Sequence, residues 1–193
     1  MLKNLNVYQI VLASKSPRRQ ELLKEMGVNF TVMTKSVDES YPANLPLSEV
    51  APYLSLKKAK AFDANELPDN YMIITADTVV IADNHILGKP KNNDDAKKML
   101  NILSGQIHKV VTGVTVKTKN CAKTFSVTSR VTFEFLDNDE ITYYIENCNP
   151  FDKAGAYGIQ EWIGYIGVSN VEGSFYNVMG LPTQRLYRVL KEF

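Results

Sequence analysis

Hydroxyl and guanidinium groups are concentrated in one short segment near the start of the chain, "ASKSPRRQELL". The segment follows an apolar run, and Ser16 followed by Pro17 is typical of the first residues of a helix. Free backbone N–H groups at a helix start bind anions, and Arg18 and Arg19 add paired donors that suit phosphate. Without an anion, each cation opposes the helix dipole by roughly 0.3–1 kcal/mol. With the Ser14 hydroxyl, the segment predicts a phosphate site; the alternative is a capped helix with solvated arginines.

An acidic residue interrupts the most apolar part of the chain, "YMIITADTVVIA". A carboxylate in such a strand costs several kcal/mol if it is buried without a partner. We therefore expect Asp77 to lie at a strand end facing a cleft, to bind a cation, or to be paired. A metal ligand and a general base are both roles for such a carboxylate. The alternative is an Asp at a bulge or turn.

Further charged residues depend on the fold for their meaning. The loop pair Asp38-Glu39 would form a two-carboxylate site for Mg²⁺ or Mn²⁺ only if it faces Asp77. The run of lysines around Lys58 is typical of a solvated helix face. Lys89 stands in a turn between a glycine and a proline, where a phosphate contact and an ordinary turn lysine are equally favoured.

A glycine-containing segment, "DKAGAYGIQ", ends in an amide. Its glycines allow the backbone to approach a neighbour closely. The Gln160 side chain has both a donor and an acceptor with which to pair a base edge, although a purely structural turn is an equal alternative. His108, at the start of an expected strand, is interpreted as a structural histidine. The sequence contains no clear Ser/His/Asp or Cys/His nucleophile set.

The elements that must position these residues follow from the apolar periodicity. We expect strands at residues 7–13, 29–34, 71–82, 107–117, 121–135 and 162–168. We expect helices at residues 17–26, 48–65 with Pro52 in the first turn, 93–103, 136–146 with Asp137 as N-cap, and 181–190. Strands and helices alternate early and β pairing dominates the middle, which predicts a mixed α/β protein with one domain over residues 1–193.

The composition limits the class of partner. The formal net charge is +1, from 22 basic and 21 acidic side chains, which gives no general attraction to nucleic acid or to an anionic membrane. No apolar run approaches the ~18 residues of a membrane span, and the first residues make a poor signal peptide. The two cysteines have no zinc-type spacing. We therefore expect a cytoplasmic protein with reduced thiols.

Taken together, the motifs resemble the Maf family of nucleoside triphosphate pyrophosphatases. The matching stretches are "LASKSPRRQELL", "VDE", "LKKAKA", "TADTVV", "LGKP", "LSGQIHKVVTGV", "DKAGAYGIQ" and "GSFYNVMGLP". They run in one order from residue 12 to residue 182 and so cover nearly the whole chain. Several unrelated short motifs in one order make the resemblance specific.

The resemblance implies a fold and a reaction. The fold is an elongated α/β structure with a mixed twisted sheet flanked by helices and two lobes around a cleft, similar to inosine triphosphatases. The reaction is metal-assisted attack of water on the α-phosphorus of a nucleoside triphosphate, which releases pyrophosphate. The form of "DKAGAYGIQ" resembles the branch that acts on dTTP and UTP, and members often form homodimers. The alternative is a nucleotide-binding regulator of cell division that does not hydrolyse its ligand.

The resemblance also implies roles for individual residues. Asp77 matches the proton acceptor. Further active-site positions are matched by Glu39, Lys58 and Lys89, and substrate-specificity positions by Arg18, Thr78 and Gln160. With Mg²⁺ or Mn²⁺ as the expected cofactor, Glu39 and Asp77 are the expected metal ligands. The sequence departs from the family after Gln160, because Glu161 and Trp162 follow where many relatives carry glycine.

Overall fold

The computed structural model describes residues 2–193. Its strands are β1 (Gln9–Leu12), β2 (Thr31–Val32), β3 (Tyr71–Ala82), β4 (His85–Leu87), β5 (Ile107–Thr118), β6 (Ala122–Phe133) and β7 (Val168–Glu172). Its α-helices are α1 (Pro17–Glu25), α2 (Leu47–Lys60), α3 (Asn93–Leu103), α4 (Asn138–Cys148), α5 (Trp162–Gly167), α6 (Phe175–Met179) and α7 (Thr183–Leu190). Short 3₁₀ helices cover Lys3–Val7, Ala64–Glu66, Pro150–Asp152 and Ala154–Ala156. Within residues 2–193, none of the helices has the length and apolar character needed to span a membrane.

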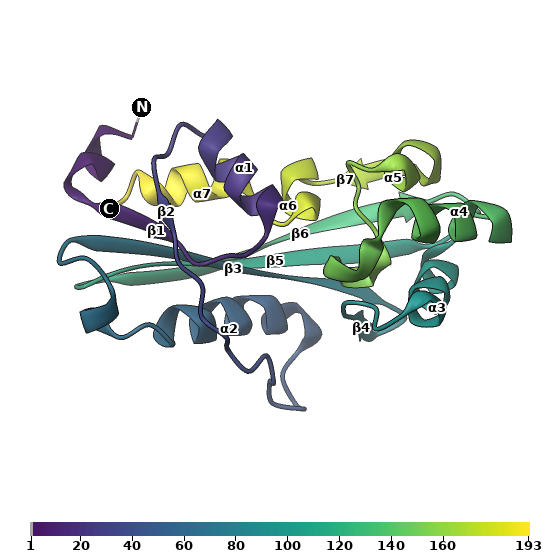
Figure 1. Ribbon diagram of the computed structural model, residues 1–193, viewed down its shortest axis with the longest axis horizontal. Coiled ribbons are helices and arrows are strands. Elements are labelled where there is room, and N and C mark those ends of the chain that lie inside the picture. The colour runs from purple at the N-terminus through teal and green to yellow at the C-terminus, as the bar shows by residue number, and fades with distance from the viewer. Residues whose placement is uncertain (1) are drawn as a thin grey trace. The chain divides into compact units, whose positions relative to one another are not determined.

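The strands form one seven-stranded sheet in the order β2-β1-β3-β5-β6-β7, with β4 paired to β3 (Figure 1). β1 pairs in parallel with both β2 and β3, whereas β4 is antiparallel to β3 and β7 is antiparallel to β6. The parallel pairs come from the strand–helix–strand opening of the chain. The expected mixed α/β fold, a mixed sheet flanked by helices, is therefore confirmed.

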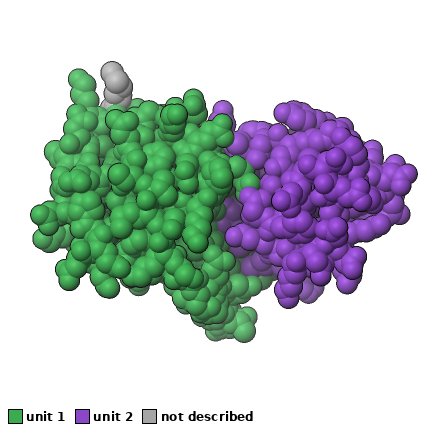
Figure 2. Space-filling view, in the orientation of Figure 1, with its two compact units in different colours: residues 1–77, 112–127, 180–193 green, residues 78–111, 128–179 purple. Residues whose placement is uncertain are grey.

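The chain divides into two compact units (Figure 2). Unit 1 comprises residues 1–77, 112–127 and 180–193, and unit 2 comprises residues 78–111 and 128–179. The first passage between them falls at the bond from Asp77 to Thr78, within β3. The expected single domain with two lobes stays a prediction.

In unit 1, helix α2 lies directly on the backbone of β5. A Cβ atom added to Gly113 would lie 2.2 Å from the Pro52 nitrogen and 2.3 Å from the Ala51 carbonyl carbon. Both Ala51 and Pro52 are buried. Only a residue without a side chain permits this backbone-to-backbone approach. Gly113 therefore sets the distance at which α2 packs on the sheet.

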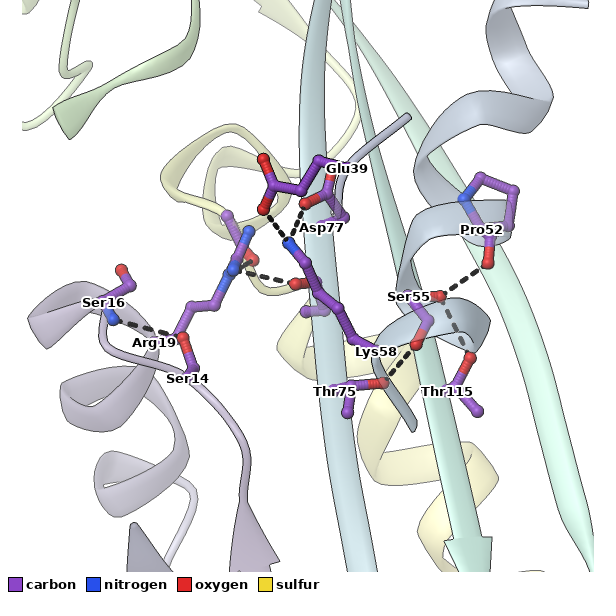
Figure 3. Close-up of polar contacts among 12 residues, drawn as sticks. Ser14, Ser16, Arg19, Glu39, Pro52, Ser55, Lys58, Thr75, Asp77 and Thr115 are labelled. Carbon is purple, nitrogen blue, oxygen red and sulfur yellow. Dashed lines mark hydrogen bonds and ion pairs between the residues drawn. The ribbon is translucent and has the colours of Figure 1, made fainter. Parts of the chain in front are cut away.

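Buried hydroxyl groups attach the same part of α2 to the strands (Figure 3). Ser55 Oγ donates to the Pro52 carbonyl at 2.8 Å and lies 3.0 Å from Thr115 Oγ1 on β5. Thr75 Oγ1, on β3, donates to the Ser55 carbonyl at 2.7 Å. The expectation that Pro52 lies in the first helical turn is wrong, because α2 begins at Leu47 and Pro52 falls in its second turn. The buried hydroxyls supply local hydrogen bonds where proline has no N–H to donate.

Unit 2 contains the largest departure from the expected elements. The strand expected at residues 162–168 is wrong, since Trp162–Gly167 forms the short helix α5. A Cβ atom at Gly164 would lie 1.8 Å from the Ile159 carbonyl oxygen, so the glycine is required where this helix turns back on the preceding loop. A short apolar run has no periodicity that separates strand from helix, and tertiary contact decides between them.

The histidine interpreted as structural is buried in unit 2. His108 Nε2 lies 2.7 Å from Tyr157 Oη, and the imidazole packs edge-on against Phe133. Burial lowers the pKa of His108 to about 4. The ring is therefore uncharged at neutral pH and acts as a packing residue, in agreement with its interpretation from the sequence.

Substitution of Gly113 by alanine tests the close packing of α2. We expect Gly113→Ala to lower the free energy of unfolding by about 1–3 kcal/mol, because the new methyl group meets backbone atoms that cannot rotate away. Gly88→Ala is the control, since a Cβ atom there has no neighbour within 4 Å. Denaturant unfolding of both variants is the measurement, and equal stability would contradict the packing argument.

Candidate active site

The carboxylate in the apolar strand is paired with a lysine of unit 1 (Figure 3). Lys58, near the end of α2, binds Asp77 Oδ1 and also lies 2.7 Å from Glu39 Oε1. The side chains of Lys58 and Asp77 are 19% and 12% exposed, whereas Glu39 is 53% exposed. Of the alternatives that the sequence left open, pairing is the one observed, and Asp77 lies within β3 rather than at its end. The expectation that Lys58 lies on a solvated helix face is wrong, because its side chain is largely buried and bound to two carboxylates.

Only one member of the acidic loop pair reaches this cluster. Asp38 accepts hydrogen bonds from the Ser40 backbone N–H at 3.1 Å and from Lys57 Nζ at 3.0 Å, as well as from the Ser40 hydroxyl. These bonds, above all that from the Ser40 hydroxyl, lower the pKa of Asp38 to about 2. Glu39 instead shares Lys58 with Asp77, so the condition for a two-carboxylate cluster is met by Glu39.

The serines of the expected phosphate segment lie at the start of α1. Ser14 is buried after β1, and its hydroxyl accepts the Ser16 N–H at 3.2 Å. As expected, Ser16 occupies the N-cap position and Pro17 is the first residue of the helix. The Ser16 hydroxyl, however, makes no capping hydrogen bond. The helix start therefore keeps the backbone geometry of an anion site while the Ser16 hydroxyl is not used in capping.

Arg19 connects this helix start to the carboxylate strand. Its Nε donates to the Gly180 carbonyl at 2.8 Å, and its Nη1 donates to the Ala76 carbonyl at 2.9 Å. Burial lowers the pKa of Arg19, the nearby charge of Asp77 opposes this shift, and the charge of Arg18 adds to it. Arg19 therefore joins the helix start to the residue that precedes Asp77 and to Gly180, and its expected contact with a phosphate stays a prediction.

Three further predicted residues belong to unit 2. Thr78 follows Asp77 directly on β3, Lys89 is exposed in the loop after β4, and Gln160 precedes α5. The Gly155 N–H donates to the Gly88 carbonyl at 3.0 Å, which joins the loop before Gln160 to the loop that contains Lys89.

The same loop also packs on β3. A Cβ atom at Gly155 would lie 3.1 Å from two methyl carbons of Val80. Val80 and Thr78 are two residues apart and share one face of the strand. Unit 2 therefore connects the segments that carry Thr78, Lys89 and Gln160.

The side-chain oxygen of Gln160 is buried without a hydrogen-bond donor among residues 2–193. A buried acceptor without a partner is unfavourable by about 1–3 kcal/mol. A ligand that donates one hydrogen bond at this position would remove that penalty. This orphan oxygen favours the recognition role of Gln160 over a purely structural turn.

Two carboxylates meet at Lys58, and carboxylate oxygens are ligands that a divalent cation prefers. Within residues 2–193, no group of three or more His, Cys, Asp or Glu side chains is arranged to hold a metal. Oxygens of Glu39 and Asp77 nevertheless converge on one cation, the ammonium of Lys58. Mg²⁺ is usually held by one or two carboxylates together with substrate phosphates and water. The donor set therefore fits a cation that binds together with a phosphate-bearing ligand.

A helix start of the kind that binds anions, together with a lysine–carboxylate cluster in a mixed α/β fold, is typical of α/β proteins that bind phosphate groups. The sequence model of the family described as "Maf-like protein" matches residues 9–193. The chain therefore belongs to the Maf-like protein family, and the resemblance stated from the motifs is confirmed.

Similar proteins cover the full length of the chain. A protein of Bacteroides thetaiotaomicron is 51% identical over 193 residues, with 100% of both chains covered. A protein of Porphyromonas gingivalis is 51% identical over 195 residues, covering 100% of this chain and 98% of its own. A protein of Flavobacterium psychrophilum is 48% identical over 182 residues, covering 94% and 93%. All three relatives are named dTTP/UTP pyrophosphatase.

Among solved structures, that of the Staphylococcus aureus Ham1 protein matches with a TM-score of 0.44 and 18% sequence identity. The match covers 65% of this chain and 71% of that one.

Removal of the Arg19 guanidinium tests its anchoring role. We expect Arg19→Met to lower the free energy of unfolding by about 1–3 kcal/mol, since two backbone carbonyls lose a charged donor. Lys15→Met, on an exposed residue of the same segment, is the control and should change stability by less than about 0.5 kcal/mol. Thermal and denaturant unfolding provide the measurement. A stability of Arg19→Met equal to that of the control would show that the guanidinium does not anchor the helix.

Proposed function

We propose that this protein is a nucleoside triphosphate pyrophosphatase that hydrolyses dTTP and UTP to the monophosphate and pyrophosphate. Membership of the Maf-like family and the shared name of relatives about half identical to the chain support the activity. The observation that carries the proposal is the cluster of Lys58 between Asp77 and Glu39, adjacent to the Arg19-anchored start of α1.

The phosphate groups of the substrate are the proposed ligands of the cationic side chains. The backbone N–H groups at the start of α1, with the hydroxyls of Ser14 and Ser16, bind phosphate oxygens. Arg18 adds charged donors at the same helix start. Arg19 keeps the helix start next to Asp77, and Lys58 and Lys89 supply further positive charge. These groups offset the charge that the phosphates develop during bond cleavage.

Asp77 is the proposed acceptor of the proton from the attacking water. Its carboxylate lies in a largely buried strand, where pairing with Lys58 compensates its charge. A carboxylate held by a buried strand on one side and a lysine on the other has a restricted orientation, which favours the alignment of a water molecule. The attack takes place on the α-phosphorus, and pyrophosphate leaves.

Glu39 and Asp77 are the proposed ligands of a divalent cation, Mg²⁺ or Mn²⁺. When bound, such a cation neutralises phosphate charge and makes a bound water more acidic. Glu39 is the more exposed of the two carboxylates and lies on a loop, so it can adjust to the ligand while Asp77 stays on its strand.

Gln160 is the proposed residue that recognises the base. Thr78 is the second residue proposed to contribute to substrate specificity. The orphan oxygen of Gln160 accepts a hydrogen bond from the N3–H group of uracil or thymine. Cytosine has an acceptor at N3 instead, and two acceptors facing each other would leave both unsatisfied. A site built to receive one hydrogen bond rejects a ligand that lacks it.

We further propose that the enzyme is a cytoplasmic homodimer. Its ligand is the nucleotide substrate, and it binds neither nucleic acid nor a membrane. The free thiols of Cys121 and Cys148 are in keeping with a reducing compartment. The net charge of +1 argues against extended contact with nucleic acid or with anionic lipid. The dimer rests on the family resemblance, and light scattering of the purified protein measures it.

Release of pyrophosphate from UTP or dTTP with Mg²⁺ or Mn²⁺ distinguishes the enzyme from a nucleotide-binding regulator. We expect Asp77→Asn to lower kcat at least about 10²-fold, because either the proton acceptor or a metal ligand is lost. Binding of a non-hydrolysable UTP analogue should change far less. Asp38→Asn is the control, since the Asp38 carboxylate is bound by Ser40 and Lys57. Turnover of Asp77→Asn at the wild-type rate would remove Asp77 from the mechanism.

The choice of base provides a second test. We expect Gln160→Ala to lower the ratio of kcat/KM for UTP to that for CTP at least about tenfold, because the acceptor for N3–H is lost. Turnover of UTP itself should fall less than this ratio. Gln106→Ala, on an exposed residue of unit 2, is the matched control. An unchanged nucleotide profile would exclude Gln160 as the reader of the base.

A further inference from the structure

The turn that presents Gln160 is held at both of its ends by one hydroxyl group. Its closing hydrogen bond runs from the Glu161 N–H to the Gly158 carbonyl at 3.0 Å. The Gly158 N–H donates to Tyr144 Oη at 3.0 Å, and the same hydroxyl donates to Glu161 Oε2. Because Tyr144 is fully buried on α4, the turn is tied to the core of unit 2.

The second oxygen of Glu161 binds a buried lysine. Lys153 Nζ lies 3.0 Å from Glu161 Oε1, and the Lys153 side chain is only 8% exposed. Lys153 also lies 2.7 Å from Asp152 Oδ1. Glu161 occupies the N-cap position of α5, yet its side chain makes no capping hydrogen bond. The carboxylate is therefore used to join three segments: the Lys153 loop, α4 and the turn itself.

The packing around the turn leaves the carboxylate little freedom. A Cβ atom at Gly158 would lie 2.8 Å from Glu161 Cδ and 3.0 Å from each carboxylate oxygen, so the carboxylate lies directly over the Gly158 backbone. Burial and the hydrogen bond to Glu161 raise the pKa of Tyr144 far above its ordinary value. The hydroxyl is therefore protonated at neutral pH and available to donate to Glu161.

We propose that Glu161 is a positioning residue for base selection. Through Tyr144 and Lys153 its carboxylate fixes the turn, and the fixed turn keeps the orphan oxygen of Gln160 in the direction from which it accepts a hydrogen bond from uracil or thymine. This inference rests on the proposed function, in which Gln160 reads the base. Both oxygens of Glu161 are bound within the protein, so the role assigned to Glu161 is to hold the turn and not to contact the base.

The test compares two variants that loosen the turn while keeping the size of the side chain. Glu161→Gln removes the charge that binds Lys153, and Tyr144→Phe removes the hydroxyl that bridges the turn. We expect both to lower the UTP to CTP ratio of kcat/KM about fivefold or more. The inhibition constant of inorganic pyrophosphate should stay unchanged, because none of the proposed phosphate-binding residues, neither those of unit 1 nor Lys89, is altered. A merely structural defect would lower the nucleotide ratio and would also raise the inhibition constant of pyrophosphate.

Tyr143→Phe is the matched control, because Tyr143 adjoins Tyr144 on α4, is half exposed, and packs against Trp162 through its ring. It should leave the nucleotide ratio at the wild-type value. If Glu161→Gln does not fold, Tyr144→Phe tests the same turn with the buried ring retained. Thermal unfolding identifies that case.

A double variant separates positioning from an independent effect. In the Gln160→Ala background there is no amide to orient, so Glu161→Gln should lower the ratio no further. If the fold-reductions of the ratio in the two single variants multiply in the double variant, that result would overturn the inference. So would a ratio that falls in Gln160→Ala but is unchanged in both Glu161→Gln and Tyr144→Phe. Wild-type protein without any preference for UTP would instead overturn the proposed base reading, and the inference with it.

Discussion

The arrangement of unit 1 depends on the need to compensate a carboxylate inside an apolar strand. Asp77 is largely buried, and the ammonium of Lys58 provides the compensating charge. That ammonium reaches the strand because α2 lies in backbone contact with Gly113 and is attached to the strands by the hydroxyls around Ser55. The same ammonium brings in Glu39 from its loop. One ion pair therefore accounts for the helix, the loop and the strand that meet there.

Arg19 and Lys58 are two cations that interact with the charge of Asp77, and they have different hydrogen-bond partners. Arg19 is bound by the carbonyls of Ala76 and Gly180, which directs a planar group with several donors to fixed backbone acceptors. Lys58 is bound by carboxylates, whose place as partner of the ammonium a phosphate can take. The arginine is thereby suited to a permanent structural role, and the lysine to exchange of partners during binding.

In unit 2, the buried side-chain oxygen of Gln160 is held in place although no group of the described residues donates a hydrogen bond to it. The orphan oxygen of Gln160 is useful only if the turn beneath it cannot rotate it toward an internal donor. The bonds from Tyr144 and Lys153 to Glu161 provide that restraint. Both oxygens of the Glu161 carboxylate are thus bound within unit 2.

The sequence by itself determined the family, the mixed α/β fold, the helix start at Ser16 and the N-cap at Asp137. These features depend on local signals, namely capping residues, periodicity and motif order. Tertiary structure decided which charge of each adjacent pair faces the site: Glu39 rather than Asp38, and Lys58 rather than its neighbour. It also decided that residues 162–167 form a helix. Such choices depend on contacts between residues far apart in the chain, and neither spacing nor residue type encodes them.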